Sequence, residues 1–288
     1  MSFASVREMI AACQASARPL WAEIQASDLT ETGMTAAESE AQMRRLWQVM
    51  CDASDHYCGT DRSASGFAGG AAARLLNAPQ NNLYLSGYPA AVMAEALKMA
   101  ECNACMKRIV AAPTAGSCGV LPAVLLPLWR SGAATEQQVF EALYVAAGFG
   151  QVIAQRATLA GAEGGCQAEI GAASAMAAAG LVALRGGTPT QCAEAFAIAL
   201  ANLEGLVCDP VAGLVELPCI QRNVTGALNA VASADLALAG VTGYLPADEV
   251  IDAMAAVGAA LPASLRETGE GGLADSPTGR AIRDALKG

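Results

Sequence analysis

The stretch that decides this fold opens with GGCQAE (164–169) and closes with GLVCDPVAGLVELPCIQRN (205–223). It holds Cys166, Cys208 and Cys219, and each cysteine stands among glycine, proline and small residues. On a turn of this kind the backbone can approach a bound cofactor closely, so the pattern is compatible with a three-thiolate site. From spacing alone, three buried cysteines that act as small apolar residues are the simpler interpretation.

Four segments of the chain resemble the α chain of the iron–sulfur-dependent L-serine dehydratases, which are also called L-serine ammonia-lyases. The segments are residues 112–117 (APTAGS), 164–169 (GGCQAE), 208–219 (CDPVAGLVELPC) and 266–268 (RET). The likeness extends along nearly the whole chain and is strongest from about residue 113 onward. Cysteine-bearing blocks of this length are far more specific than a short glycine pattern.

The resemblance implies that Cys166, Cys208 and Cys219 bind a 4Fe–4S cluster and that the other seven cysteines do not. Three thiolates leave one iron open to act as a Lewis acid on the substrate hydroxyl. The implied reaction is the α,β-elimination of water from L-serine, which yields pyruvate and ammonia and belongs to amino-acid degradation and gluconeogenesis. A related cluster-dependent lyase, such as an L-cysteine desulfidase, and a non-enzymatic helical scaffold remain alternatives.

The elimination also needs a base for the α-proton, and His56 is the one histidine in the chain. It stands in a polar stretch, residues 52–57, where a surface histidine is the simpler interpretation. The resemblance implies that the base is a histidine of a β subunit, with which this chain would form a heterodimer within a higher oligomer. No catalytic residue is therefore assigned in this chain, and His56 stays the weaker alternative.

A loop of small residues, 112–122, precedes an apolar run and is expected to open a helix. Such a loop presents free backbone N–H groups and a positive dipole end, which suit a carboxylate. An ordinary link between two helices is the alternative, and the resemblance favours the carboxylate site. The expected substrate-binding residues are Thr114, Gly116, Ser117 and Gly119. The acidic candidates for the substrate ammonium are Glu169, Asp209 and Glu216.

The composition excludes several classes of protein. The 288 residues include 17 Lys and Arg against 27 Asp and Glu, so a net charge of −10 argues against nucleic acid and anionic membranes as partners. Ten cysteines without an evident signal peptide favour a cytoplasmic protein with metal or redox chemistry. The uncharged run 109–129 is interrupted by prolines and glycines, so we expect core there rather than a membrane span.

Helical periodicity runs almost throughout, and the alternation typical of strands is hard to find. The sequence therefore predicts an all-α fold around a central cluster site, with the cysteines on turns at helix ends. We expect one domain over residues 1–288, with residues 1–60 as peripheral N-terminal helices. Capping boxes are predicted at Thr35, Thr135 and Thr188. The uncharged segment 170–184 predicts a central helix that its neighbours pack closely. Further helices are expected at about 5–17, 89–108 and 224–239, and from residue 246.

Overall fold

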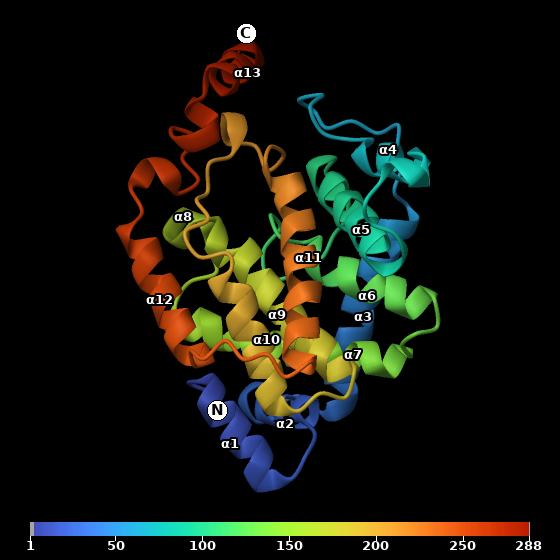
Figure 1. Cartoon of the computed structure of the whole chain (residues 1–288), viewed down its shortest axis with the longest axis vertical. Helices are drawn as coiled ribbons and strands as arrows, with labels where there is room; N and C mark the ends of the chain where they lie inside the picture. Colours follow the sequence, from blue (N-terminus) through green and yellow to red (C-terminus); the bar gives the residue numbers. More distant parts are fainter. Residues whose placement is uncertain (1–2, 288) are drawn as a thin grey trace.

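A computed structural model describes residues 3–287 of the chain (Figure 1). Helix accounts for 68% of the protein, and no strand occurs within the described range, so the predicted all-α fold is confirmed. The α-helices are α1 (Val6–Ser16), α2 (Leu20–Thr32), α3 (Ala36–Asp55), α4 (Ala71–Asn77), α5 (Gly87–Ala104), α6 (Val120–Arg130), α7 (Glu136–Arg156), α8 (Gly161–Gly164), α9 (Ile170–Leu184), α10 (Pro189–Ala201), α11 (Cys219–Leu238), α12 (Ala247–Ala260) and α13 (Pro277–Lys287). Short 3₁₀ turns are η1 (Gln80–Asn82), η2 (Cys166–Ala168), η3 (Val211–Gly213), η4 (Ala263–Leu265) and η5 (Gly272–Asp275).

Local sequence signals fix the starts of several helices. The three predicted capping boxes are present, because Thr35, Thr135 and Thr188 each accept a hydrogen bond from the third helical N–H and receive the reciprocal bond. Pro189 follows Thr188 at the first helical position, where its missing N–H costs nothing. These signals act within one turn of helix, which is why the sequence alone locates them.

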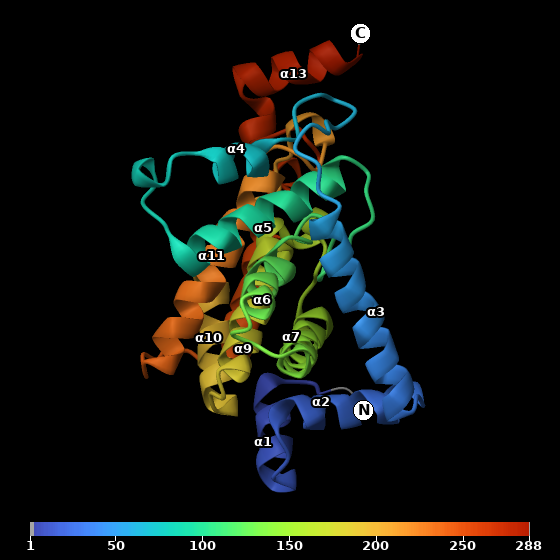
Figure 2. The same cartoon turned by 90° about the vertical axis from the view of Figure 1, so that its right-hand side faces the viewer.

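Helix α9 lies at the centre, and α7, α10 and α11 pack around it (Figure 2). Its residues are buried on all sides, and the small ones permit close approach. A Cβ at Gly180 would stand 2.9 Å from the Ala142 carbonyl oxygen of α7. A Cβ at Gly226 of α11 would stand 2.8 Å from the Ile170 side chain. The central, closely packed helix predicted from the sequence is therefore present.

Two helix boundaries differ from the sequence prediction. Helix α5 ends at Ala104 because Met106 adopts a left-handed backbone conformation (φ 58°) and Lys107 N donates to Cys102 O, which closes the helix. Helix α11 begins at Cys219, five residues earlier than expected, directly after Pro218. Cys219 is therefore the first residue of a helix rather than part of a turn.

The two ends of the molecule are formed by α1 and α2 at one pole and by α13 at the other (Figures 1 and 2). Buried side chains of α1 and α3, such as Met9 and Trp47, nevertheless belong to the same apolar cluster as α9. We propose on this ground that the chain is a single domain with residues 1–60 at its periphery.

One segment within residues 3–287 is helical, long and apolar enough to cross a membrane, namely Cys166–Leu184. It is 89% buried inside the protein, as expected of a core helix. The uncharged run 109–129 forms a loop followed by most of the buried helix α6, in line with the prediction of core there.

Candidate active site

Three separate elements bring Cys166, Cys208 and Cys219 into one region. Cys166 begins η2 at the N-terminal end of α9, Cys208 lies in the connection between α10 and η3, and Cys219 begins α11. The first two are buried and the third is half-buried. Cys166 and Cys219 both act electrostatically on Cys208, so the three thiols share one environment. Within the described residues, no other cysteine is among the main influences on the pKa of these three.

Burial is the main influence on all three thiols. It raises the pKa of Cys166 to about 11 and that of Cys219 to about 12, and it raises the pKa of Cys208 still more strongly. The carboxylate of Glu169 adds to the pKa of each of the three, since a nearby negative charge disfavours the thiolate. The thiols of Cys166 and Cys219 are therefore neutral near pH 7, even with a nearby arginine charge.

Among the described residues, Arg222 is the cation that favours the thiolates, and no sequence motif pointed to it. It opposes the rise in pKa at Cys166 and Cys219. The guanidinium is anchored by a hydrogen bond from Nη1 to Val207 O (2.8 Å) and by an ion pair between Nη2 and Asp209 Oδ1 (2.8 Å). Its position, three residues after Cys219 on α11, places it beside the thiols.

The three thiols suit an iron–sulfur cluster better than a single metal ion. Within residues 3–287, no three His, Cys, Asp or Glu side chains converge closely enough to hold a single metal ion. Three thiols in one buried region have the ligand chemistry of an iron–sulfur cluster, whose several irons hold the thiolates farther apart than one ion does. The residues therefore fit a cluster in kind and number.

The segment that follows α12 holds Cys208 in place. Cys208 N donates to Leu265 O (2.9 Å), and Glu267 N donates to Cys208 O (2.8 Å), so residues 208 and 266 form an isolated parallel bridge. Leu273 N then donates to Asp209 Oδ2 (2.8 Å). The RET segment at 266–268, which carried part of the resemblance, thus lies beside Cys208.

The expected substrate loop lies next to Glu169. Thr114 Oγ1 donates to Glu169 Oε1 (2.6 Å) and lies 3.1 Å from the buried hydroxyl of Ser117. A Cβ on Gly116 would stand 3.1 Å from the same carboxylate oxygen. The other oxygen, Oε2, is 4.0 Å from Cys208 Sγ. Glu169 therefore joins the loop to the thiols.

Asn223 connects this loop to Cys219, and no sequence motif pointed to it either. Its Oδ1 accepts a hydrogen bond from Gly119 N (2.9 Å), and its Nδ2 donates to Gly116 O (2.7 Å) and Cys219 O (2.9 Å). The amide of Gly119 is thus engaged by Asn223 in this structure. One buried side chain orients both the loop and the start of α11.

His56 lies apart from this region. It ends α3, is exposed, and its Nδ1 is 2.8 Å from Asp52 O. Glu216 by contrast lies close in sequence to Cys219, and its Oε2 accepts a hydrogen bond from Ser65 Oγ (2.5 Å). The loop that contains Ser65 is therefore next to the segment leading into α11.

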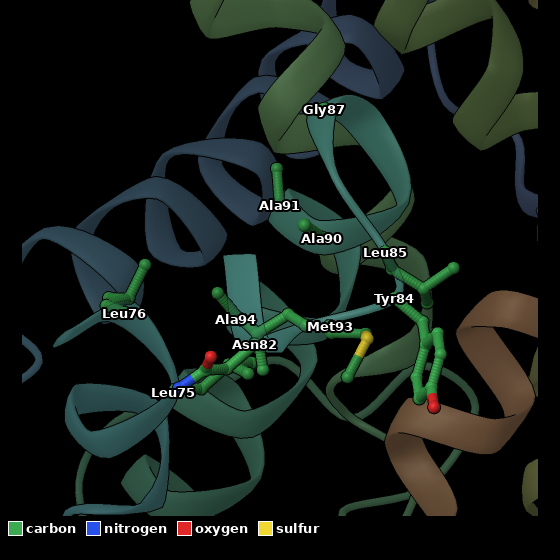
Figure 3. Close-up of a pocket in the computed structure, with 11 residues that line it drawn as sticks. Leu75, Leu76, Asn82, Tyr84, Leu85, Gly87, Ala90, Ala91, Met93 and Ala94 are labelled. Carbon is green, nitrogen blue, oxygen red and sulfur yellow. The ribbon is translucent and has the colours of Figure 1, made fainter. Parts of the chain in front are cut away.

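A pocket of about 490 Å³ lies elsewhere, between α4 and α5 (Figure 3). Leucine, alanine, methionine and tyrosine side chains dominate its lining, to which Asn82 adds a polar group. None of the three cysteines and no acidic or basic residue lines it. The pocket thus lacks groups for acid–base or metal chemistry, and the candidate site stays at the thiols.

Comparison with known proteins gives consistent matches. Residues 7–274 match the family described as serine dehydratase alpha chain. The chain is 43% identical over 292 residues to the L-serine dehydratase, alpha chain, of Peptoniphilus asaccharolyticus, with 98% of both chains covered. It is 50% identical over 228 residues to a probable L-serine dehydratase, alpha chain, of Bacillus subtilis, with 78% of this chain and 76% of the relative covered. It is also 37% identical over 254 residues to the L-serine dehydratase TdcG of Escherichia coli, covering 83% of this chain and 54% of that relative.

Proposed function

The chain belongs to the serine dehydratase alpha chain family, and on this premise we propose that it is the cluster-binding, catalytic α subunit of an L-serine dehydratase. The observation that carries the proposal is the match along residues 7–274 to a family whose relatives bear that name. The meeting of the 112–119 loop, Glu169 and Cys208 supports it, because the segments that resemble the family converge on one place.

The reaction removes the α-proton and the β-hydroxyl of L-serine as water. The aminoacrylate that forms tautomerises to an imine, which a water molecule hydrolyses to pyruvate and ammonia. Hydroxide is a poor leaving group, so the reaction needs an acid at the hydroxyl and a base at the α-carbon. These two needs are served by different parts of the assembly.

Cys166, Cys208 and Cys219 are the residues that we propose to hold a 4Fe–4S cluster. When bound, the cluster supplies an open iron as a Lewis acid for the departing hydroxyl. Arg222 lowers the cost of bringing the thiolates together, since its positive charge opposes the effect of burial on the pKa of Cys166 and Cys219. Burial also excludes water from the reacting groups, which strengthens every electrostatic contact there.

The substrate carboxylate is held, in this proposal, by the loop with Thr114, Gly116, Ser117 and Gly119. The hydroxyls of Thr114 and Ser117 lie 3.1 Å apart, close enough for both to contact one carboxylate. The Thr114 hydroxyl donates to Glu169 in this structure, so it would exchange that partner for the carboxylate when substrate binds. Gly119 N now donates to Asn223, so it would exchange that partner for substrate or serve to position the loop. Charge-assisted hydrogen bonds of this kind are the strong ones in binding sites.

The base for the α-proton is proposed to come from a β subunit. Within residues 3–287, no histidine side chain lies at the thiols, because His56 is exposed at the end of α3. A base must reach its proton directly or through one water. The complete enzyme is then a heterodimer or a higher oligomer. All ten cysteines are free thiols, which suits a cytoplasmic location.

The test compares turnover of L-serine by the anaerobically reconstituted chain with and without a cognate β subunit. We expect turnover only with the β subunit, in both the wild type and a His56→Ala variant. Full activity of this chain alone that disappears on the His56→Ala change would make His56 the base. Faster turnover of L-cysteine than of L-serine would identify a desulfidase, and the absence of iron and sulfide would identify a scaffold.

A further inference from the structure

The structure separates the three acidic residues that the sequence offered as ammonium ligands, Glu169, Asp209 and Glu216, by their partners. Asp209 already has a cation, because its Oδ1 is 2.8 Å from Arg222 Nη2, and its Oδ2 accepts the N–H of Leu273. Glu216 is buried, accepts a hydrogen bond from Ser65 and acts electrostatically on Cys105 rather than on the three thiols. Neither carboxylate faces the loop at 112–119.

Glu169 has a different environment. One oxygen accepts the hydroxyl of Thr114 at 2.6 Å, and the other lies 4.0 Å from Cys208 Sγ. Two glycines leave room for the carboxylate, since a Cβ on Gly161 would stand 2.5 Å from Oε2 and one on Gly116 would stand 3.1 Å from Oε1. The carboxylate therefore occupies a slot between the loop and the thiols, and a larger residue at Gly161 or Gly116 would make it shift.

No positive charge compensates Glu169. Within the described residues 3–287, no ion pair involves it, and the charged group that acts on it is a second carboxylate, Glu267. A half-buried carboxylate beside another acid and without a cation is costly, since buried charges are normally paired. A positively charged ligand group would remove this cost.

We propose that Glu169, with the hydroxyl of Thr114 beside it, binds the α-ammonium of the substrate and so selects an α-amino acid over a simple hydroxy acid. This inference rests on the proposed function. The α-carboxylate and α-ammonium share one carbon, so the groups that bind them must adjoin, as Thr114 and Glu169 do. The second oxygen of Glu169 lies 4.0 Å from Cys208 Sγ, so the carboxylate that would bind the ammonium adjoins both the loop and the thiols.

The test uses two ligands that differ only in the ammonium group and that do not react, L-alanine and propanoate. Their dissociation constants from the cluster-loaded complex with the β subunit are measured by ligand-observed NMR, which needs no turnover. The wild type should bind L-alanine about 10- to 100-fold more tightly than propanoate, the effect of one charge-assisted contact. In Glu169→Gln this preference should fall to about one, with propanoate affinity retained.

Glu216→Gln is the matched control, because it neutralises a buried carboxylate that also accepts a hydroxyl, and it should keep the preference for L-alanine. A Glu169→Gln complex that keeps the preference, or that loses iron along with it, would overturn the inference. Should Glu169→Gln fail to fold, equal affinity of the wild type for both ligands would also overturn it. Absent turnover of L-serine by the wild-type complex would instead refute the proposed function.

Discussion

Replacing Asn223 by alanine tests whether one side chain couples the loop at 112–119, the proposed substrate loop, to the thiols. Asn223 is 1% exposed, and its amide bonds to Gly119 N, Gly116 O and Cys219 O. Alanine removes all three bonds and supplies no replacement. Within the described residues, the loop then loses the side-chain hydrogen bonds that connect it to the first turn of α11.

The expected loss of stability follows from the groups left behind. A buried backbone group without a partner costs about 1–3 kcal/mol. The change leaves the buried Gly119 N–H and the half-buried Gly116 C=O without their Asn223 partner. We therefore expect the free energy of unfolding of the metal-free chain to fall by about 3 kcal/mol. This is a large part of the roughly 5–15 kcal/mol that stabilises a typical domain.

The assays are urea denaturation of the metal-free chain and iron content after anaerobic reconstitution. Asn229→Ala on the same helix is the matched control, because that amide also donates twice, to Ser174 Oγ (2.9 Å) and Ala199 O (2.8 Å), away from the thiols. Both variants should lose stability, and only Asn223→Ala should lose iron. Unchanged stability and iron in Asn223→Ala would refute the coupling.

Three further predictions concern the thiols and the loop. Cys208→Ser should lower the iron content and abolish activity. Its control is Cys192→Ser, on the buried face of α10, which should keep full iron. Full iron in Cys208→Ser would exclude Cys208 as a ligand. Ser117→Ala should weaken L-serine binding about 10-fold or more, through the loss of about 1.5–3 kcal/mol, and unaltered steady-state kinetics would contradict it. Burial raises the pKa of Cys51 to about 11 from an ordinary 9.0, so the folded chain keeps this thiol protonated at a pH where the unfolded chain ionises it. The free energy of unfolding should therefore fall as the pH rises from 9 through 11, and a value that is flat over this range would contradict the prediction.

Features encoded within one helical turn could be read from the sequence. The capping boxes at Thr35, Thr135 and Thr188 are local, and so is the burial of Cys192 at helical spacing on α10. The all-α fold follows from such signals repeated along the chain. The resemblance to the family added the cysteine assignment, which spacing alone did not favour.

Features that depend on distant segments could not be read in this way. Asn223 and Arg222 carry no motif of their own, and their roles arise because α11 packs against the loop at 112–119 and the segment at 207–209. The proposed ammonium ligand could be chosen among Glu169, Asp209 and Glu216 only from the hydrogen bonds and ion pairs that each makes in the structure. Of the three, Glu169 is the one that contacts the loop, through Thr114.

The pairing of Cys208 with the segment at 265–267 has a consequence for the order of events during synthesis. Residues 166, 208 and 219 leave the ribosome well before residue 265, yet Cys208 acquires its backbone partners only when that segment arrives. Asp209 then gains its bond to Leu273 N later still. The proposed cluster could therefore enter the finished geometry only after residues 265–267 have been synthesised and have folded back. In a nascent chain stalled before residue 263, Cys208 would lack these backbone partners.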